Sequence, residues 1–177
     1  MIMPKEGLEI RFDDVLLYGS LTGSMKNSLR HNTFFGHFKE ADKILVEYDF
    51  PCIMAIVARG IEEYPEWVQY VKERQSRYTL ALHCWDHHYH HTQDEEEAYG
   101  ELAKARDKIE ETFGVKLERW YVPFGRMFFP EWGIRMAERL GLKFHTRGGT
   151  IRHRYFHYWN SRDRNQLKLI LNNYVKH

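Results

Sequence analysis

The chain lacks most features that mark secreted, membrane-bound or nucleic-acid-binding proteins. It has two cysteines among 177 residues, which argues against a disulfide framework and fits a reducing compartment. No apolar run approaches the roughly 20 residues of a membrane-spanning helix, and the N-terminus has no apolar core of a secretory signal. Its 26 basic and 25 acidic residues nearly balance, so bulk charge does not indicate nucleic-acid binding. We therefore expect a soluble, cytoplasmic protein without nucleic-acid or membrane partners.

Apolar residues, by contrast, are sufficient for a sizeable core. The sequence is 43% hydrophobic and 15% aromatic, which is typical of a folded protein rather than a disordered one. Its length suits one domain and leaves no room for two. We predict a single catalytic domain over residues 1–177.

Strand-like and helix-like segments alternate along the chain. Thr92 and Glu95 have the spacing of a capping box before the best-defined helix, which Gly114 ends. Alternating strands and helices favour a parallel sheet in an α/β fold. The expected strands are residues 8–17, 52–57, 78–82, 117–122, 142–145 and 154–158, and the expected helices are residues 35–48, 65–75, 93–113, 130–140 and 162–175.

Chemically active residues follow several of these strands. The pair Asp13 and Asp14 interrupts the first apolar segment, and His83 directly follows the third predicted strand. Parallel folds carry their chemistry at the carboxyl ends of the strands. We therefore expect these side chains to meet at one rim, together with the turn after Pro123 and with His157.

His83 and His87 would supply two imidazoles, and the pair Asp13 and Asp14 would supply one carboxylate for a metal and one spare carboxylate. Three protein ligands leave an open position for water, and the spare carboxylate can take its proton. A plainer interpretation is also open, because a chain with 11 histidines contains four-residue spacings by chance. The histidines would then lie in a solvated loop and the aspartates in a solvated turn.

In these residues the chain resembles the polysaccharide deacetylase (NodB-like) family, carbohydrate esterase family 4. The first family motif is matched by Phe12-Asp13-Asp14 and the second, His-x-x-x-His, by the segment from His83 to His87. The third is matched in part by Val122-Pro123-Phe124-Gly125, and the last by Phe156-His157. The order and spacing of the motifs agree over nearly the whole chain.

This resemblance implies a fold and a set of roles. The fold would be a deformed, incomplete (β/α) barrel. One divalent metal ion, zinc or else cobalt or nickel, would be held by Asp14, His83 and His87. Asp13 would be the general base and His157 the general acid. The backbone N–H of Phe124 would bind the oxyanion.

Departures from the family pattern accompany the match. The arginine of the third motif is replaced by Val122, and either Arg119 or Arg126 could substitute for it by reaching Asp13. The supporting aspartate of the fourth motif has no counterpart in residues 146–150. His145 and His153 compete with His157 for the acid role.

Aromatic side chains near these motifs could form a wall for a sugar ring. Trp85, Tyr121 and Phe124 are candidates, and for any single one core packing is the alternative. With Arg119 they make up the predicted substrate-binding set.

We predict a metal-dependent hydrolase that removes N-acetyl or O-acetyl groups from a carbohydrate. The same residues could instead hydrolyse a small-molecule amide. A third alternative is a deacetylase-like protein that binds a glycan without turnover. The residues do not indicate an oligomeric state.

Overall fold

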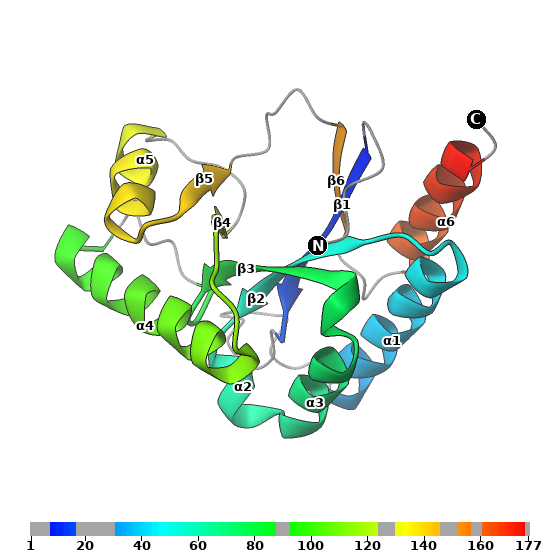
Figure 1. Cartoon of the computed structure of the whole chain (residues 1–177), viewed down its shortest axis with the longest axis horizontal. Helices are drawn as coiled ribbons and strands as arrows, with labels where there is room; N and C mark the ends of the chain where they lie inside the picture. Colours follow the sequence, from blue (N-terminus) through cyan, green and yellow to red (C-terminus); the bar gives the residue numbers. More distant parts are fainter. Residues whose placement is uncertain are drawn as a thin grey trace.

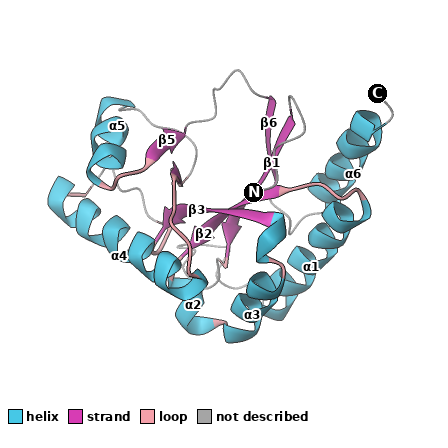
Figure 2. Ribbon diagram, viewed as in Figure 1, coloured by secondary structure: helices cyan, strands magenta, loops and turns pink. Residues whose placement is uncertain are grey.

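Six parallel strands form one sheet in the computed structural model, which describes residues 8–16, 31–87, 93–123, 130–145, 152–156 and 161–175 (Figure 2). Neighbouring strands are parallel in every pair. The strands are β1 (Leu8–Val15), β2 (Cys52–Val57), β3 (Tyr78–Cys84), β4 (Arg119–Tyr121), β5 (Lys143–His145) and β6 (Arg152–Phe156). Their order across the sheet is β5-β4-β3-β2-β1-β6.

The helices form an arc around these strands (Figure 1). They are α1 (His31–Glu47), α2 (Arg59–Glu63), α3 (Pro65–Glu73), α4 (Glu95–Phe113), α5 (Pro130–Arg139) and α6 (Ser161–Val175), with a 3-10 turn at Gln75–Arg77. No helix in the described part of the chain is both long and apolar enough to cross a membrane.

The sheet curls without closing into a complete barrel. β5 and β6 are its two edges, and within the described ranges each pairs with a single neighbour. A closed barrel would require the two edge strands to pair. The predicted fold class, a deformed and incomplete (β/α) barrel, is therefore confirmed.

Side chains on β1 alternate between two buried environments. Leu8, Ile10 and Phe12 belong to the main hydrophobic core. Glu9, Arg11 and Asp13 occupy the alternate positions and are also buried. A second, smaller core cluster consists of Ile53, Ala55, Ala81 and Tyr121. The charged residues of β1 share one side of the sheet with this smaller cluster, because the guanidinium of Arg11 contacts the ring of Tyr121.

The ends of α4 differ in part from the prediction. Asp94 is the N-cap, and its side chain accepts hydrogen bonds from the backbone N–H groups of Glu96 and Glu97. The predicted cap, Thr92, lies outside the described residues. Gly114 ends the helix with a φ of 64°, as predicted, because glycine adopts this left-handed conformation without strain.

Two strand boundaries bear on the functional site. β3 continues to Cys84, so His83 lies within the strand rather than just after it. β6 covers residues 152–156 instead of 154–158, so His157 directly follows the last residue of that strand.

Candidate active site

The two adjacent aspartates lie where β1 departs from regular geometry. Phe12 is paired with Met54 and Val15 with Ile56, so β1 has one residue more than β2 over this stretch. Asp14 has a φ of 59°, which is uncommon for a residue with a side chain, although aspartate tolerates it better than most. Bulges of this kind change the direction of a side chain beside active sites. At this bulge Asp14 contacts His83 in β3 and His87 just after it.

A second irregularity lies in β3, at His83. Ile56 pairs with Leu82 and Val57 with Cys84, so His83 is the additional residue of the strand. The chain then turns, and His87 has a φ of 36°. Because β2 lies between β1 and β3, the two bulges flank it at the same end of the sheet.

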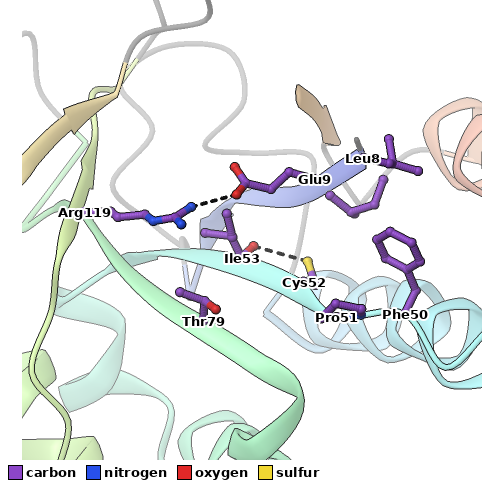
Figure 3. Close-up of a pocket in the computed structure, with 9 residues that line it drawn as sticks. Leu8, Glu9, Phe50, Pro51, Cys52, Ile53, Thr79 and Arg119 are labelled. Carbon is purple, nitrogen blue, oxygen red and sulfur yellow. Dashed lines mark hydrogen bonds and ion pairs between the residues drawn. The ribbon is translucent and has the colours of Figure 1, made fainter. Parts of the chain in front are cut away.

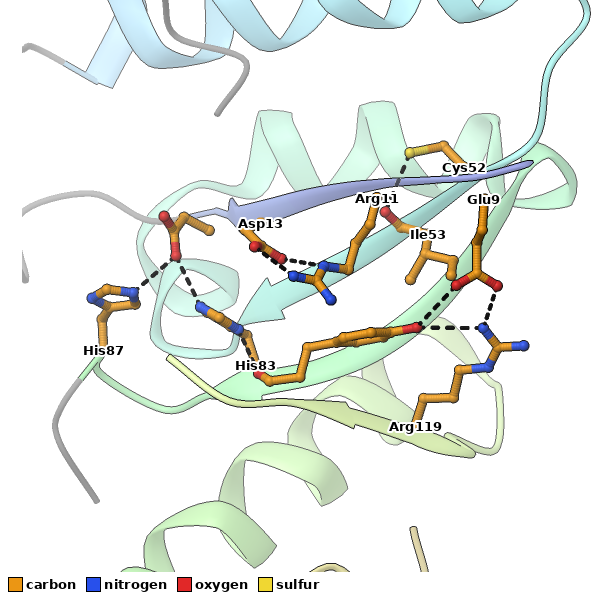
Figure 4. Close-up of polar contacts among 10 residues, drawn as sticks. Glu9, Arg11, Asp13, Cys52, Ile53, His83, His87 and Arg119 are labelled. Atoms are coloured by element: carbon orange, nitrogen blue, oxygen red, sulfur yellow. Dashed lines mark hydrogen bonds and ion pairs between the residues drawn. The ribbon is translucent and has the colours of Figure 1, made fainter. Parts of the chain in front are cut away.

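Asp14, His83 and His87 converge at this end. Oδ1 of Asp14 lies 2.9 Å from Nε2 of His83 and 2.9 Å from Nε2 of His87 (Figure 4). The ligand atoms of the three residues lie within 4.8 Å of one another. Two imidazoles and one carboxylate are a donor set of catalytic zinc sites, which keep a fourth position open. The three residues therefore fit a divalent metal ion.

Backbone contacts orient these donors. Nδ1 of His83 lies 2.6 Å from the carbonyl oxygen of Tyr121, so the tautomer that donates there leaves Nε2 as the acceptor. The indole of Trp120 donates to the carbonyl oxygen of His83 at 3.0 Å. The backbone N–H of His87 donates to Sγ of Cys84 at 3.1 Å. β4 thus fixes the ring of His83 from the side opposite to Asp14.

The segment from His83 to His87 is also attached to two helices. Arg59 on α2 forms an ion pair with Asp86 at 2.6 Å, and its backbone N–H donates to the carbonyl oxygen of Trp85. The ammonium group of Lys104 on α4 lies 3.4 Å from the centre of the Trp85 ring. Trp85 also packs against the main core, so its ring is engaged by the protein itself.

Electrostatics keep Asp14 ionised. Burial alone would raise the pKa of Asp14, but the close contacts with the His83 and His87 imidazoles hold that pKa well below its usual range. For His83, burial lowers the pKa and the contact with Asp14 raises it more, which leaves a net increase. Burial raises the pKa of the Cys84 thiol, so Cys84 stays protonated. A carboxylate ligand must be deprotonated to bind a metal, and Asp14 meets that condition.

Asp13 has a different partner from the one we predicted. Nε of Arg11 lies 2.6 Å from Oδ1 of Asp13, and Nη2 donates to Oδ2 at 2.9 Å. Arg119 forms an ion pair with Glu9, at 2.7 Å, rather than with Asp13. Of the two arginines predicted to reach Asp13, Arg119 does not, and Arg126 lies outside the described residues. Arg11 could have been found from the sequence, because residues two apart on a strand share a face.

Tyr121 lies beneath the site and is only 1% exposed. Its ring contacts the guanidinium of Arg11, 4.1 Å from the ring centre, and the ring of His145, 5.1 Å between centroids. Its hydroxyl lies 3.4 Å from Nη1 of Arg119. A residue this buried supports the site from inside the barrel, and the wall-forming role predicted for Tyr121 does not match its position.

A small cavity lies at the opposite end of the sheet. It is lined by the first residues of β1 and β2 and by Thr79 and Arg119 (Figure 3). Its volume of about 50 Å³ is far below the roughly 300–1,000 Å³ of ligand pockets. The amino ends of the strands in parallel barrels serve stability rather than catalysis. This cavity is therefore separate from the metal-binding end.

Three predicted residues lie outside the described part of the chain. They are Phe124, Arg126 and His157. The oxyanion, arginine and acid roles given to them stay predictions.

Comparisons with known proteins indicate one family and one fold. The family model described as Polysaccharide deacetylase matches residues 9–145. None of the curated proteins matches the chain. Among solved structures, the peptidoglycan deacetylase PdaC from Bacillus subtilis aligns with a TM-score of 0.68 at 12% identity, over 96% of this chain and 83% of that one. A family 4 carbohydrate esterase from Streptomyces lividans, in complex with acetate, aligns with a TM-score of 0.71 at 13% identity, over 96% and 88%.

A further similar structure is described as a pseudoenzyme. It is a family 4 protein from Bacillus anthracis, with a TM-score of 0.71 at 12% identity, over 97% of this chain and 61% of that one. At such identities the structures establish the fold, while the family match covers more than half of the chain. The chain therefore belongs to the polysaccharide deacetylase family.

Proposed function

We propose that this protein is a metal-dependent hydrolase that removes N-acetyl or O-acetyl groups from a carbohydrate. Asp14, His83 and His87 hold the metal, Asp13 is the general base and His157 the general acid. The observation that carries this proposal is the convergence of the three donors at 2.9 Å contacts beside a second carboxylate. The family match and the acetate complex of a similar structure also support it.

The bound ion would supply Lewis acidity, which lowers the pKa of water toward about 7 and polarises a carbonyl group. Asp13 accepts a proton from the attacking water as its oxygen bonds to the carbonyl carbon of the acetamide. The backbone N–H of Phe124 donates to the developing oxyanion. His157 protonates the leaving nitrogen as the C–N bond breaks, so that acetate and a free amine result.

The test is acetate release from oligomers of N-acetylglucosamine by the zinc-loaded protein, alongside the Asp13→Asn variant. We expect turnover by the wild type. We expect Asp13→Asn to keep its metal and to lose turnover by about 10²–10⁴-fold, the usual effect of removing a general base. Normal turnover in Asp13→Asn would remove Asp13 from the mechanism.

Two other functions remain as outcomes of this test. Release of product from small cyclic amides, with none from acetylated sugars, would assign the same site to small-molecule amide hydrolysis. The second alternative is a protein that binds a glycan without turnover, and one similar structure is described as a pseudoenzyme. Glycan binding by the metal-loaded protein without acetate release would support that alternative.

A further inference from the structure

Both carboxylate oxygens of Asp13 are engaged by one guanidinium. Arg11 contacts Oδ1 through Nε at 2.6 Å and Oδ2 through Nη2 at 2.9 Å. The two side chains are 8% and 11% exposed. One hydrogen bond, from Nη2 to Oδ2, and one ion-pair contact, between Nε and Oδ1, restrict the plane of the carboxylate as well as its position. In a buried pair these contacts are not weakened by competing water.

The guanidinium of Arg11 packs against the ring of Tyr121. The distance from the guanidinium to the centre of the ring is 4.1 Å, within the range of a cation–π interaction. The carbonyl oxygen of the same tyrosine lies 2.6 Å from Nδ1 of His83. Tyr121 therefore contacts the support of Asp13 through its side chain and a candidate metal ligand through its backbone.

We propose that Arg11, supported by the ring of Tyr121, is the positioning residue that orients Asp13 toward the water above the metal site. Arg11 acts through Asp13, and Tyr121 keeps the orientation of Asp13 aligned with that of His83. The kinetic consequence rests on the proposed function, whereas the orientation itself can be tested without it.

The kinetic experiment compares Arg11→Met and Arg11→Lys with the wild type, all loaded with zinc. We expect metal content to stay at about one ion per chain and KM to change little. We expect kcat to fall by up to about 10²-fold in Arg11→Met, the scale of a misplaced catalytic group. Arg11→Lys keeps the charge but not the two-point contact, so its kcat should lie between the two.

A matched control exists in another part of the fold. Arg74 lies 3.8 Å from the centre of the Tyr70 ring and 3.9 Å from the carboxylate of Asp42, a similar trio remote from the aspartate pair. Arg74→Met should therefore keep the wild-type kcat. The decisive comparison is Arg11→Met in the Asp13→Asn background, where we expect no further loss because both changes remove one function.

Two results would overturn the proposal. One is an additive loss of kcat in the double variant, and the other is wild-type turnover in Arg11→Met.

If the wild type releases no acetate, the proposed function fails, and crystal structures of zinc-loaded Arg11→Met and Arg11→Lys decide whether Arg11 orients Asp13. We expect the Asp13 carboxylate to rotate while the Asp14 and histidine positions stay fixed. An unmoved Asp13 would refute the role of Arg11. If Arg11→Met does not fold, the kinetic and structural comparisons are made with Arg11→Lys alone.

Discussion

The two ring nitrogens of His83 have separate partners, and this separation makes it a good candidate ligand. Nδ1 faces the carbonyl oxygen of Tyr121 and Nε2 faces Asp14. A backbone acceptor on one side fixes the tautomer, so the other nitrogen presents its lone pair to a metal. The sequence identified His83 by its position near a strand end, but the backbone partner carries no sequence signal.

Arg11 and Arg119 show where residue-level prediction failed. The family pattern directed attention to Arg119 and Arg126, but Arg119 lies at the amino end of the sheet, where it lines the small cavity. The side-chain face of β1 was the better guide, because Glu9, Arg11 and Asp13 alternate with apolar residues. Glu9 lies at the amino end of that face and forms an ion pair with Arg119.

The buried Asp42 network yields a prediction of pH dependence. Asp42 is 1% exposed and accepts hydrogen bonds from the hydroxyls of Tyr70, at 2.7 Å, and Tyr78, at 2.6 Å. Burial, followed by the contact with Asp42, raises the pKa of both tyrosines. Above the unfolded-state value of about 10, the unfolded chain loses these protons and the folded chain keeps them. Stability is therefore fully present below about pH 10 and declines as the pH rises.

The change to make is Tyr78→Phe, and the measurement is urea unfolding between pH 7 and 11. At pH 7 we expect a loss of about 1–3 kcal/mol, because a donor to a buried carboxylate is removed. Above pH 10 the variant should lose stability less steeply than the wild type. Equal slopes above pH 10 would contradict the assigned pKa shift.

At the level of elements, apolar patterns predicted the strands well and their bulges not at all. The continuous apolar run at Cys52–Val57 is a strand with those same bounds, because a strand buried on both faces has no polar interruption. The irregularities between Phe12 and Val15 and at His83 are shifts of strand register, and the apolar pattern of a single strand does not specify its register with a neighbour. They are nevertheless what brings the candidate ligands together.

Helix α2 packs closely against the residue that follows β1. A Cβ added at Gly60 would lie 2.0 Å from the carbonyl oxygen of Leu16, two residues after Asp14. Gly60→Ala should therefore lower the free energy of unfolding by about 1–3 kcal/mol, the usual cost of overpacking, and should weaken metal binding. Thermal unfolding and zinc titration measure the two effects.

Gly100 is the matched control, because it lies within α4 and has no atom within 4 Å of an added Cβ. Gly100→Ala should raise stability by about 0.5–1 kcal/mol and leave zinc affinity unchanged. A Gly60→Ala protein as stable as Gly100→Ala would contradict the close approach of α2 to β1.

For the whole molecule, the two ends of the parallel sheet have different contents. The amino end holds a cavity of about 50 Å³, and the carboxyl end holds the convergent donors. This division was predictable, since parallel folds place chemistry at the carboxyl ends of strands. The supports of the site come from β4, α2 and α4, and they depend on tertiary packing that no local pattern indicates.

Metal binding should also stabilise the whole fold, because the donors join β1 to β3. A ligand at 100 times its Kd stabilises the folded state by about 2.7 kcal/mol, or roughly 5–10 °C in Tm for a chain of this size. We expect zinc to raise the Tm of the wild type by about this amount and of Asp14→Ala hardly at all. The His37→Ala variant, which removes a histidine paired with Glu40 on α1, should keep the increase. An equal increase in Asp14→Ala would mean that zinc binds elsewhere.

Elemental analysis of the purified protein shows whether Asp14, His83 and His87 form a metal site. After zinc loading and dialysis, we expect about one divalent ion per chain in the wild type and in His37→Ala, and almost none in Asp14→Ala and His83→Ala. Absence of metal from the wild type, after soaking with zinc, cobalt or nickel, would contradict the account. So would retention of the ion by either ligand variant.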